Sequence, residues 1–256
     1  MVIKTKTVFR LLPALSVFFL MLGLAGCHPH KKEIPTGSPI QLTNIYSSPA
    51  YDYSHLVNVL VLPVANPVAD AYVKQKKSDL LLSLLRNFGK FNYFALQTDP
   101  DPTIETLNFA DIETGQIDRF RLGAIAAARN AQAVLVVSVG EYRPFSPMRM
   151  SVKAALIDAR TGEKIWACDQ IFDASDANVV NGMRYWWNTQ QSGGLSSNRF
   201  ELNQFHPTFF TDFVFFSIAQ SYAESRVHNV EAIRNQAGME QEKKKSIQEV
   251  QQHALR

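Results

Sequence analysis

The stretch AVLVVSV, residues 133–139, is the strongest strand signal in the chain. A short run of Ala, Val and Leu with a single serine is typical of a buried strand. The segment VNVLVLPV, residues 57–64, has the same character. We therefore expect both segments to be inner strands of a sheet, with helices packed on it.

Helical patterns separate these strands. Asn66-Pro67 has the residue types of a helix cap followed by a first-turn proline. Beyond it, Leu81, Leu84, Leu85 and Phe88 recur at helical spacing. Gly89 suits the left-handed end of such a helix. A strand over 91–96 is expected to follow.

The segment 97–113 is expected to be a polar loop, and a second helix is predicted for about 116–130. Its apolar stripe consists of Ile117, Phe120, Ala124, Ile125 and Ala128. A hairpin is predicted after the 133–139 strand, with arms at 150–159 and 163–172 joined by a turn that contains a glycine. A last helix is expected at about 207–227.

The predicted order of elements is strand, helix, strand, helix, three strands, helix. Alternation followed by a hairpin indicates an α/β (α+β) fold, a mixed sheet of about five strands with helices packed on it.

The first residues have the pattern of an export signal. Lys4, Lys6 and Arg10 precede an apolar run that extends from Leu11 to Leu24, and no acidic residue interrupts them. The run is shorter than the ~20 residues that span a bilayer as a helix. It ends in Leu24-Ala25-Gly26-Cys27, which is similar to the bacterial lipobox. That resemblance implies cleavage before Cys27 and a lipid on its sulfur, and an ordinary secretory signal is the alternative. The sorting rule of enteric lipoproteins, applied to His28, implies the outer membrane.

We expect four segments: a signal peptide at 1–26, a lipid-anchored flexible tether at 27–55, a periplasmic α/β domain at 56–228, and a polar tail at 229–256 that is disordered or helical. The tether contains scattered Pro, Gly, Ser and Thr without hydrophobic periodicity. The tail is rich in Glu, Gln and Lys.

Charge and cysteine content narrow the function. Without the three basic residues of the signal, 23 Lys and Arg balance 23 Asp and Glu, so no nucleic-acid partner is expected. Cys168 is then the one remaining cysteine, and its apolar surroundings predict a small buried side chain.

The strand, Pro-x-x-Asn turn and Thr-Gly-Glu hairpin also resemble a known family. The relevant strings are residues 59–66, 89–91, 131–137 and 156–166. They are similar to one α/β domain of envelope proteins. It occurs in the curli secretion channel lipoprotein, in lipoprotein activators of penicillin-binding proteins, and in the N-terminal domain of the Tol system's periplasmic propeller protein. The resemblance covers about 55–228 and implies a non-catalytic domain that forms rings or binds a larger machine.

Motifs of known chemistry are absent from the sequence, so we expect no enzyme activity, cofactor, metal site or small-molecule substrate. His28 and His30 are interpreted as linker residues. Asp169, Asp173 and Asp176 lack the spacing of a calcium loop and are expected to lie at a strand end and turn.

Two aromatic clusters stand out. The phenylalanines between Phe209 and Phe216 are expected to bury a helix on the sheet. Tyr185, Trp186 and Trp187 occur in a polar region that we expect to be irregular, and three large aromatic side chains are costly to expose. They either pack beneath the segment or anchor a protein partner, and they are the candidate partner-binding residues.

The leading hypothesis is a lipid-anchored structural subunit of an envelope-spanning assembly, such as a secretion or flagellar apparatus, with protein partners in an oligomeric assembly. The alternative is a lipoprotein regulator of a peptidoglycan synthase, against which the short tether counts. A hydrolase whose site follows no known motif is a third reading.

Overall fold

The computed structural model describes residues 37–49, 51–68, 70–98, 119–190 and 200–254. The signal, Cys27, His28 and His30 lie outside these ranges, and their predicted roles stay predictions. Searched over the described residues, the structure has no helix that is both long and apolar enough to cross a membrane.

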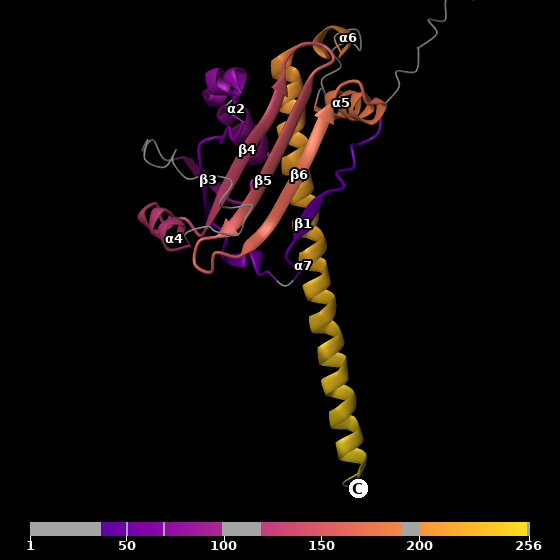
Figure 1. Ribbon diagram of the computed structural model, residues 1–256. Coiled ribbons are helices and arrows are strands. Elements are labelled where there is room, and N and C mark those ends of the chain that lie inside the picture. The colour runs from indigo at the N-terminus through magenta and orange to yellow at the C-terminus, as the bar shows by residue number, and fades with distance from the viewer. Residues whose placement is uncertain (1–36, 50, 69, 99–118, 191–199, 255–256) are drawn as a thin grey trace, which may run out of the picture. The chain divides into compact units, whose positions relative to one another are not determined.

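The described strands form one mixed sheet in the order β1-β6-β5-β4-β2-β3 (Figure 1). They are β1 (Ile45–Ser47), β2 (Asn58–Val61), β3 (Ala95–Thr98), β4 (Ala133–Arg143), β5 (Arg149–Asp158) and β6 (Lys164–Asp173). β2 is parallel to β3 and β4, whereas β4, β5, β6 and β1 pair antiparallel. The α/β class is confirmed, with one more strand than expected.

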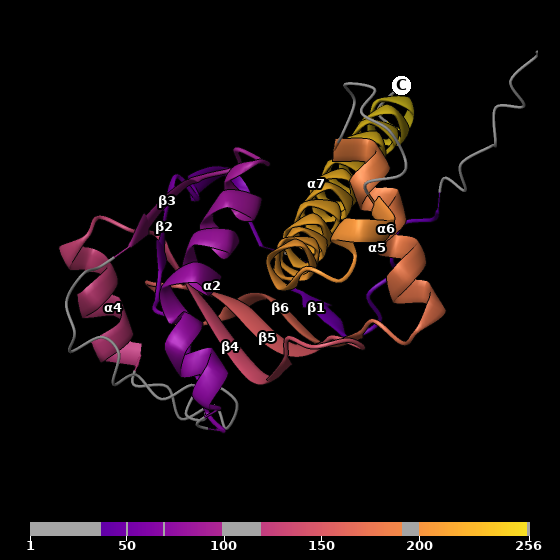
Figure 2. The same cartoon turned by 90° about the horizontal axis from the view of Figure 1, so that it is seen from above.

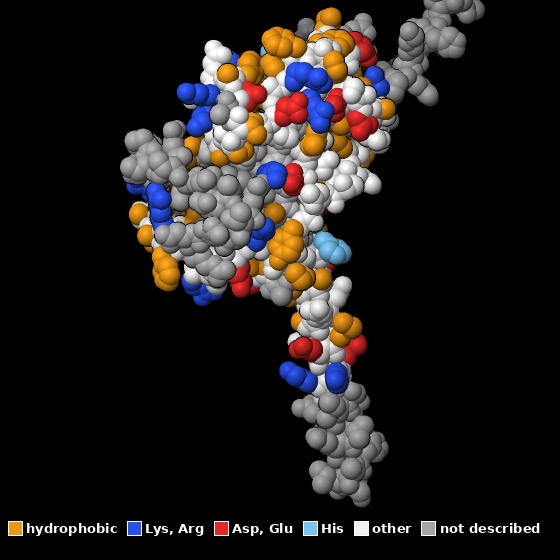
Figure 3. Space-filling view, viewed as in Figure 1, with side chains coloured by type: hydrophobic (Ala, Val, Ile, Leu, Met, Phe, Trp, Pro, Cys, Tyr) orange, Lys and Arg blue, Asp and Glu red, His pale blue; other side chains and the backbone are white. Residues whose placement is uncertain are grey.

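Helices cover both faces of the sheet. They are α2 (Ala71–Gly89), α4 (Arg119–Ala128), α5 (Ala177–Gln190), α6 (Phe200–Asn203) and α7 (Pro207–Ala254). α2 and the first half of α7 pack on one face of the sheet (Figure 2). Val59, Leu135 and Trp166 belong to the larger core on that face. α4 covers part of the opposite face through Leu122 and Ala126. Where β5 and β6 are visible in Figure 3, the surface is mainly backbone and uncharged polar side chains with a few charged residues.

The extra strand corrects the predicted tether. β1 pairs with β6 through Ile45, Tyr46 and Ser47, and a short 3-10 helix, Tyr53–His55, follows it. Ile40, Leu42 and Tyr53 also pack in the larger core. The tether prediction of 27–55 is therefore wrong at its C-terminal end, because isolated apolar residues between prolines become buried only when β6 supplies the partner strand.

Both ends of α2 differ from the sequence prediction. The helix begins at Ala71, where the Asp70 carboxylate accepts a hydrogen bond from the Val73 amide at 2.9 Å. Asn66 instead closes the preceding turn: its side-chain amide donates to the Asp70 carbonyl, and its side-chain oxygen accepts from the Asp70 amide. The left-handed conformation falls on Asn92, at φ 51°, and not on Gly89.

The β5–β6 hairpin is confirmed almost to the residue. At its turn, the Asp158 carboxylate accepts hydrogen bonds from the backbone amides of Arg160 and Thr161, both at 2.8 Å. Gly162 adopts the left-handed conformation at φ 69°.

The phenylalanines of α7 are buried as expected. Phe210, Phe213 and Phe215 are at most 1% exposed, and Tyr222 packs edge-on against Trp166 with ring centroids 5.7 Å apart. The last buried contact is made by Asn229, whose amide donates to Ser47 Oγ at 2.7 Å and to the Ser48 carbonyl at 2.9 Å. From Glu231 to Lys245 the helix is almost entirely exposed.

Candidate functional site

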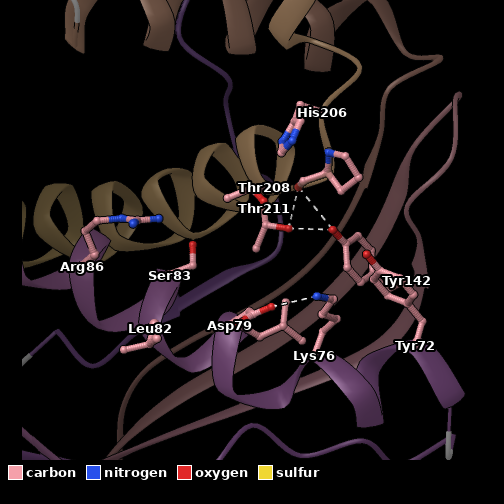
Figure 4. Close-up of a pocket in the computed structure, with 12 residues that line it drawn as sticks. Tyr72, Lys76, Asp79, Leu82, Ser83, Arg86, Tyr142, His206, Thr208 and Thr211 are labelled. Atoms are coloured by element: carbon pink, nitrogen blue, oxygen red, sulfur yellow. Dashed lines mark hydrogen bonds and ion pairs between the residues drawn. The ribbon is translucent and has the colours of Figure 1, made fainter.

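A groove lies between α2 and the start of α7 (Figure 4). Its volume is about 470 Å³. One wall is a face of α2 that carries Tyr72, Lys76, Asp79, Ser83 and Arg86. These positions alternate in steps of four and three residues, which places them on one side of a helix.

The opposite wall is the first turn of α7 with the residue before it, and a tyrosine from β4 closes one end. Proline at the first position of α7 loses no helical hydrogen bond, so the chain can turn from His206 directly into the helix. This brings His206, Thr208 and Thr211 to the groove, facing α2 (Figure 4).

Ion pairs hold the charged side chains of the groove. Lys76 Nζ lies 3.1 Å from Asp79 Oδ2, one helical turn away. Arg86 pairs with Asp212 of α7, which also accepts a hydrogen bond from the Ser83 hydroxyl. The Arg86–Asp212 pair joins the two helices, whereas Lys76 and Asp79 are both well exposed and pair with each other on α2 (Figure 4).

Tyr142 brings a hydroxyl group to the groove's end. Thr211 Oγ1 donates to the Pro207 carbonyl at 2.9 Å, and its oxygen lies 2.8 Å from the Tyr142 hydroxyl. Burial raises the pKa of Tyr142 to about 12, although the Thr211 contact lowers it, so the hydroxyl keeps its proton at neutral pH. The Tyr72 ring packs edge-on against Tyr142, with centroids 5.1 Å apart.

A second polar cluster lies at the hairpin turn. Tyr51 donates to Asp158 Oδ2 at 2.7 Å, and its oxygen lies 2.8 Å from His55 Nε2, which is therefore the donor to Tyr51. Burial opposes ionisation of Asp158, but bonds from the Thr161 amide, Tyr51 and the Arg160 amide outweigh it and hold its pKa below the usual range. The cluster ties the segment after β1 to the hairpin.

The predicted partner-binding residues lie on α5, not in an irregular segment. Trp186 is 8% exposed and packs against Phe209 at 5.0 Å between ring centroids, so it belongs to the core. Trp187 also contacts Phe209 and, like Tyr185, is half-buried. Trp186 therefore packs inside the domain. Contact of a protein partner with the exposed parts of Tyr185 and Trp187 stays a prediction.

The aspartates near the end of β6 have ordinary structural partners. Asp169 pairs with Lys153 at 3.4 Å, and Asp173 accepts from the Ser175 amide at 2.8 Å. Asp176 accepts from the Asn178 amide at the start of α5. Among the described residues no group of three His, Cys, Asp or Glu side chains is placed to hold a metal ion. Cys168 is buried, and burial raises the pKa of its thiol to about 12.

Sequence reasoning missed the α2–α7 groove. The polar spacing from Tyr72 to Arg86 was visible as the face of α2 opposite its apolar stripe. No local pattern, however, indicates that this face meets residues 206–211, more than 100 positions away along the chain. The pairing depends on which helices share a face of the sheet.

Comparison with known proteins finds likeness only to solved structures. No family model and no curated protein matches the sequence. Among solved structures, a PelC dodecamer from Paraburkholderia phytofirmans aligns at 16% identity over 54% of this chain and 87% of its own, with a TM-score of 0.37. Lipoprotein GNA1162 from Neisseria meningitidis aligns at 20% identity over 55% and 99%, with a TM-score of 0.35.

The C-terminal domain of LpoB from Salmonella enterica aligns at 23% identity over 45% of this chain and 82% of its own, with a TM-score of 0.31. Of these three neighbours, GNA1162 is described as a lipoprotein. Their TM-scores and identities are too low to carry a function to this chain.

Proposed function

We propose that the protein is an outer-membrane lipoprotein, anchored through Cys27, whose periplasmic domain is a non-catalytic structural subunit of an envelope-spanning assembly. The signal pattern and the Leu24–Cys27 tetrad support the anchor. Confinement to a layer beside the membrane raises the effective concentration of the domain for its partners.

The exposed half of α7 is the observation that carries the assembly role. Residues 231–245 continue the helix beyond the last core contact at Asn229. An unsupported helix of this length is marginal in water, and Gly238 weakens it by about 1 kcal/mol relative to alanine. A helical extension that adds nothing to its own core is expected to be stabilised by a partner.

The root of this extension also carries an apolar stripe. Val227, Val230 and Ile233 are 48%, 39% and 37% exposed and recur at three-residue spacing. An amphipathic helix of this kind can dock its apolar side into a partner's groove. Residues 231–254 span roughly 36 Å at 1.5 Å per residue, so the contact can lie well outside the domain.

The short connection to the anchor favours partners near the same membrane. Nine residues, 28–36, separate Cys27 from the first described residue, and fully extended they cover at most about 32 Å. The alternative, regulation of a peptidoglycan synthase, requires reach toward the opposite membrane and is less well supported.

The test is site-specific crosslinking in cells. A photoreactive residue is placed at Arg234 on the exposed half of α7 and, as a control, at Lys164, which is exposed at the hairpin. Complexes are then extracted in mild detergent, separated by size and analysed by mass spectrometry. We expect Arg234 to crosslink envelope proteins within a large particle, and Lys164 to do so much less. A small species that carries only a glycan synthase would contradict the assembly role and favour the regulator.

A further inference from the structure

The groove between α2 and α7 has the size and the mixed lining of a ligand site. Its volume of about 470 Å³ lies within the ~300–1,000 Å³ of small-molecule sites. It does not involve the exposed half of α7, so its role is independent of the partner contact proposed above. The sequence alone had predicted no small-molecule ligand.

The charge balance of the groove indicates a ligand without net charge. Lys76 is paired with Asp79, and Arg86 is paired with Asp212. An anionic ligand would have to compete with these carboxylates for the two cations. A cation would compete in turn with Lys76 for Asp79, so neither sign of charge is favoured.

The exposed Lys76–Asp79 ion pair is suited to bind a ligand hydroxyl group in particular. A hydroxyl group both donates and accepts, whereas a lysine ammonium only donates and a carboxylate only accepts. One ligand hydroxyl can therefore accept from Lys76 and donate to Asp79 while the ion pair stays in place. Hydrogen bonds to charged groups are stronger than those between neutral groups.

Neutral hydroxyl groups continue this lining along the groove. Thr208 lines it from α7, the Ser83 oxygen remains able to accept because its proton goes to Asp212, and the Tyr142 hydroxyl lies at the end of the groove (Figure 4). Several donors and acceptors spaced along an open groove match the repeated hydroxyls of a sugar chain.

Apolar surface alternates with these polar groups. Tyr72 is half-buried beside Tyr142, and Leu82, on the same stretch of α2, is 64% exposed. A pyranose ring presents C–H groups on its faces and hydroxyls around its edge, so it can pack on an aromatic or aliphatic side chain while its edge is hydrogen-bonded. We infer that this groove binds a neutral glycan, with Lys76 and Asp79 holding one sugar hydroxyl and Tyr72 with Leu82 contacting a ring.

The inference is tested by ligand-observed NMR on the full-length, detergent-solubilised lipoprotein. The probes are chitotetraose and maltotetraose, which are neutral glycans with and without acetamido groups, and inorganic phosphate. We expect saturation transfer to at least one tetrasaccharide, and the preferred one indicates the kind of polymer. Asp79→Ala and Tyr72→Ala should each weaken binding about tenfold.

Lys74→Ala is the matched control, because Lys74 is exposed on α2 but does not line the groove. It should leave binding unchanged. Asp79 and Lys76 are well exposed, so Asp79→Ala should fold, which circular dichroism will verify. No transfer to either saccharide at millimolar concentration, binding of phosphate alone, or glycan binding insensitive to Asp79→Ala would overturn the inference. The crosslinking at Arg234 is unaffected by either result.

Discussion

Asp158 shows how one residue can join distant parts of this chain. Its side chain is 2% exposed, closes the β5–β6 turn through two backbone amides, and accepts a hydrogen bond from Tyr51, 107 positions earlier. A buried carboxylate is tolerated only when hydrogen bonds replace its lost hydration. The same bonds lower its pKa, which links this site to the pH dependence of folding.

We therefore predict that Asp158→Asn lowers the free energy of unfolding by about 1–3 kcal/mol at pH 7, because it leaves hydrogen bonds at the turn unsatisfied. Because the folded-state pKa of Asp158 is depressed, its contribution is present above the unfolded pKa of about 3.9 and is lost as pH falls through the folded value. Urea unfolding at pH 7 and at lower pH should show the difference between variant and wild type shrinking on acidification. The exposed Asp169→Asn is the control, and an equal effect there would contradict the prediction.

The contribution of Asn130 to stability comes from its backbone conformation. It takes the left-handed conformation at φ 51° directly after α4, where the Ala131 amide bonds back to the Ala126 carbonyl. Asparagine tolerates this region and glycine prefers it, whereas alanine pays about 1–2 kcal/mol. We expect Asn130→Ala to lower thermal stability and Asn130→Gly to leave it nearly unchanged. Equal melting temperatures for the two variants would refute this assignment.

At the scale of elements, α7 is one helix whose two halves differ in burial. Its first half, up to Asn229, is buried on the face of the sheet that α2 also covers. Phe210, Val214 and Ile218 in this half are each 0% exposed. Its second half is exposed from Glu231 to Lys245. The hydrophobic effect therefore stabilises the first half within the domain, and the second half has only local helix propensity to maintain it.

Removal of residues 235–256 should separate the stability of the domain from the proposed assembly role of the exposed half of α7. We predict that the free energy of unfolding of the domain changes by no more than about 0.5 kcal/mol, because surface segments outside the core contribute little. The size of the native complex should fall markedly. Chemical denaturation and gel filtration of detergent extracts measure the two effects. A large loss of stability would show that the segment belongs to the domain's own core.

At the scale of the whole molecule, only nine residues, 28–36, separate the proposed anchor at Cys27 from the first described residue. The folded domain begins at residue 37, because Gly37 packs against the backbone of Asn181 and Tyr185 of α5. The domain is thus predicted to stay close to its membrane.

Cys27→Ser tests this arrangement. The substitution removes the thiol that would carry the lipid, and two or more acyl chains are what make such an anchor effectively permanent. We predict that the variant moves from the membrane fraction to the soluble periplasmic fraction while its circular dichroism spectrum stays that of the wild type. Retention in the membrane fraction would show that Cys27 is not the anchor.

The sequence by itself determined the elements whose signals are local. The apolar runs of β2 and β4, the hairpin with Gly162, and the apolar stripe of α7 are short-range patterns that burial demands wherever the segment lies. They were sufficient for the α/β class and for the order of strands β2 to β6 along the chain. Helix ends were less well placed, because Asp70 and Asn66 are both good caps and the choice between them depends on the preceding turn.

Only the tertiary structure decided what distant segments do together. β1 is a strand because β6 offers an unpaired edge, Trp186 is a core residue because α5 lies on the phenylalanines of α7, and the groove exists because α2 and α7 share one face of the sheet. Each depends on contacts between residues far apart in the chain. Hydrophobic periodicity records which side of an element is buried, but not against what, and that is the physical reason the site could not be predicted from the sequence.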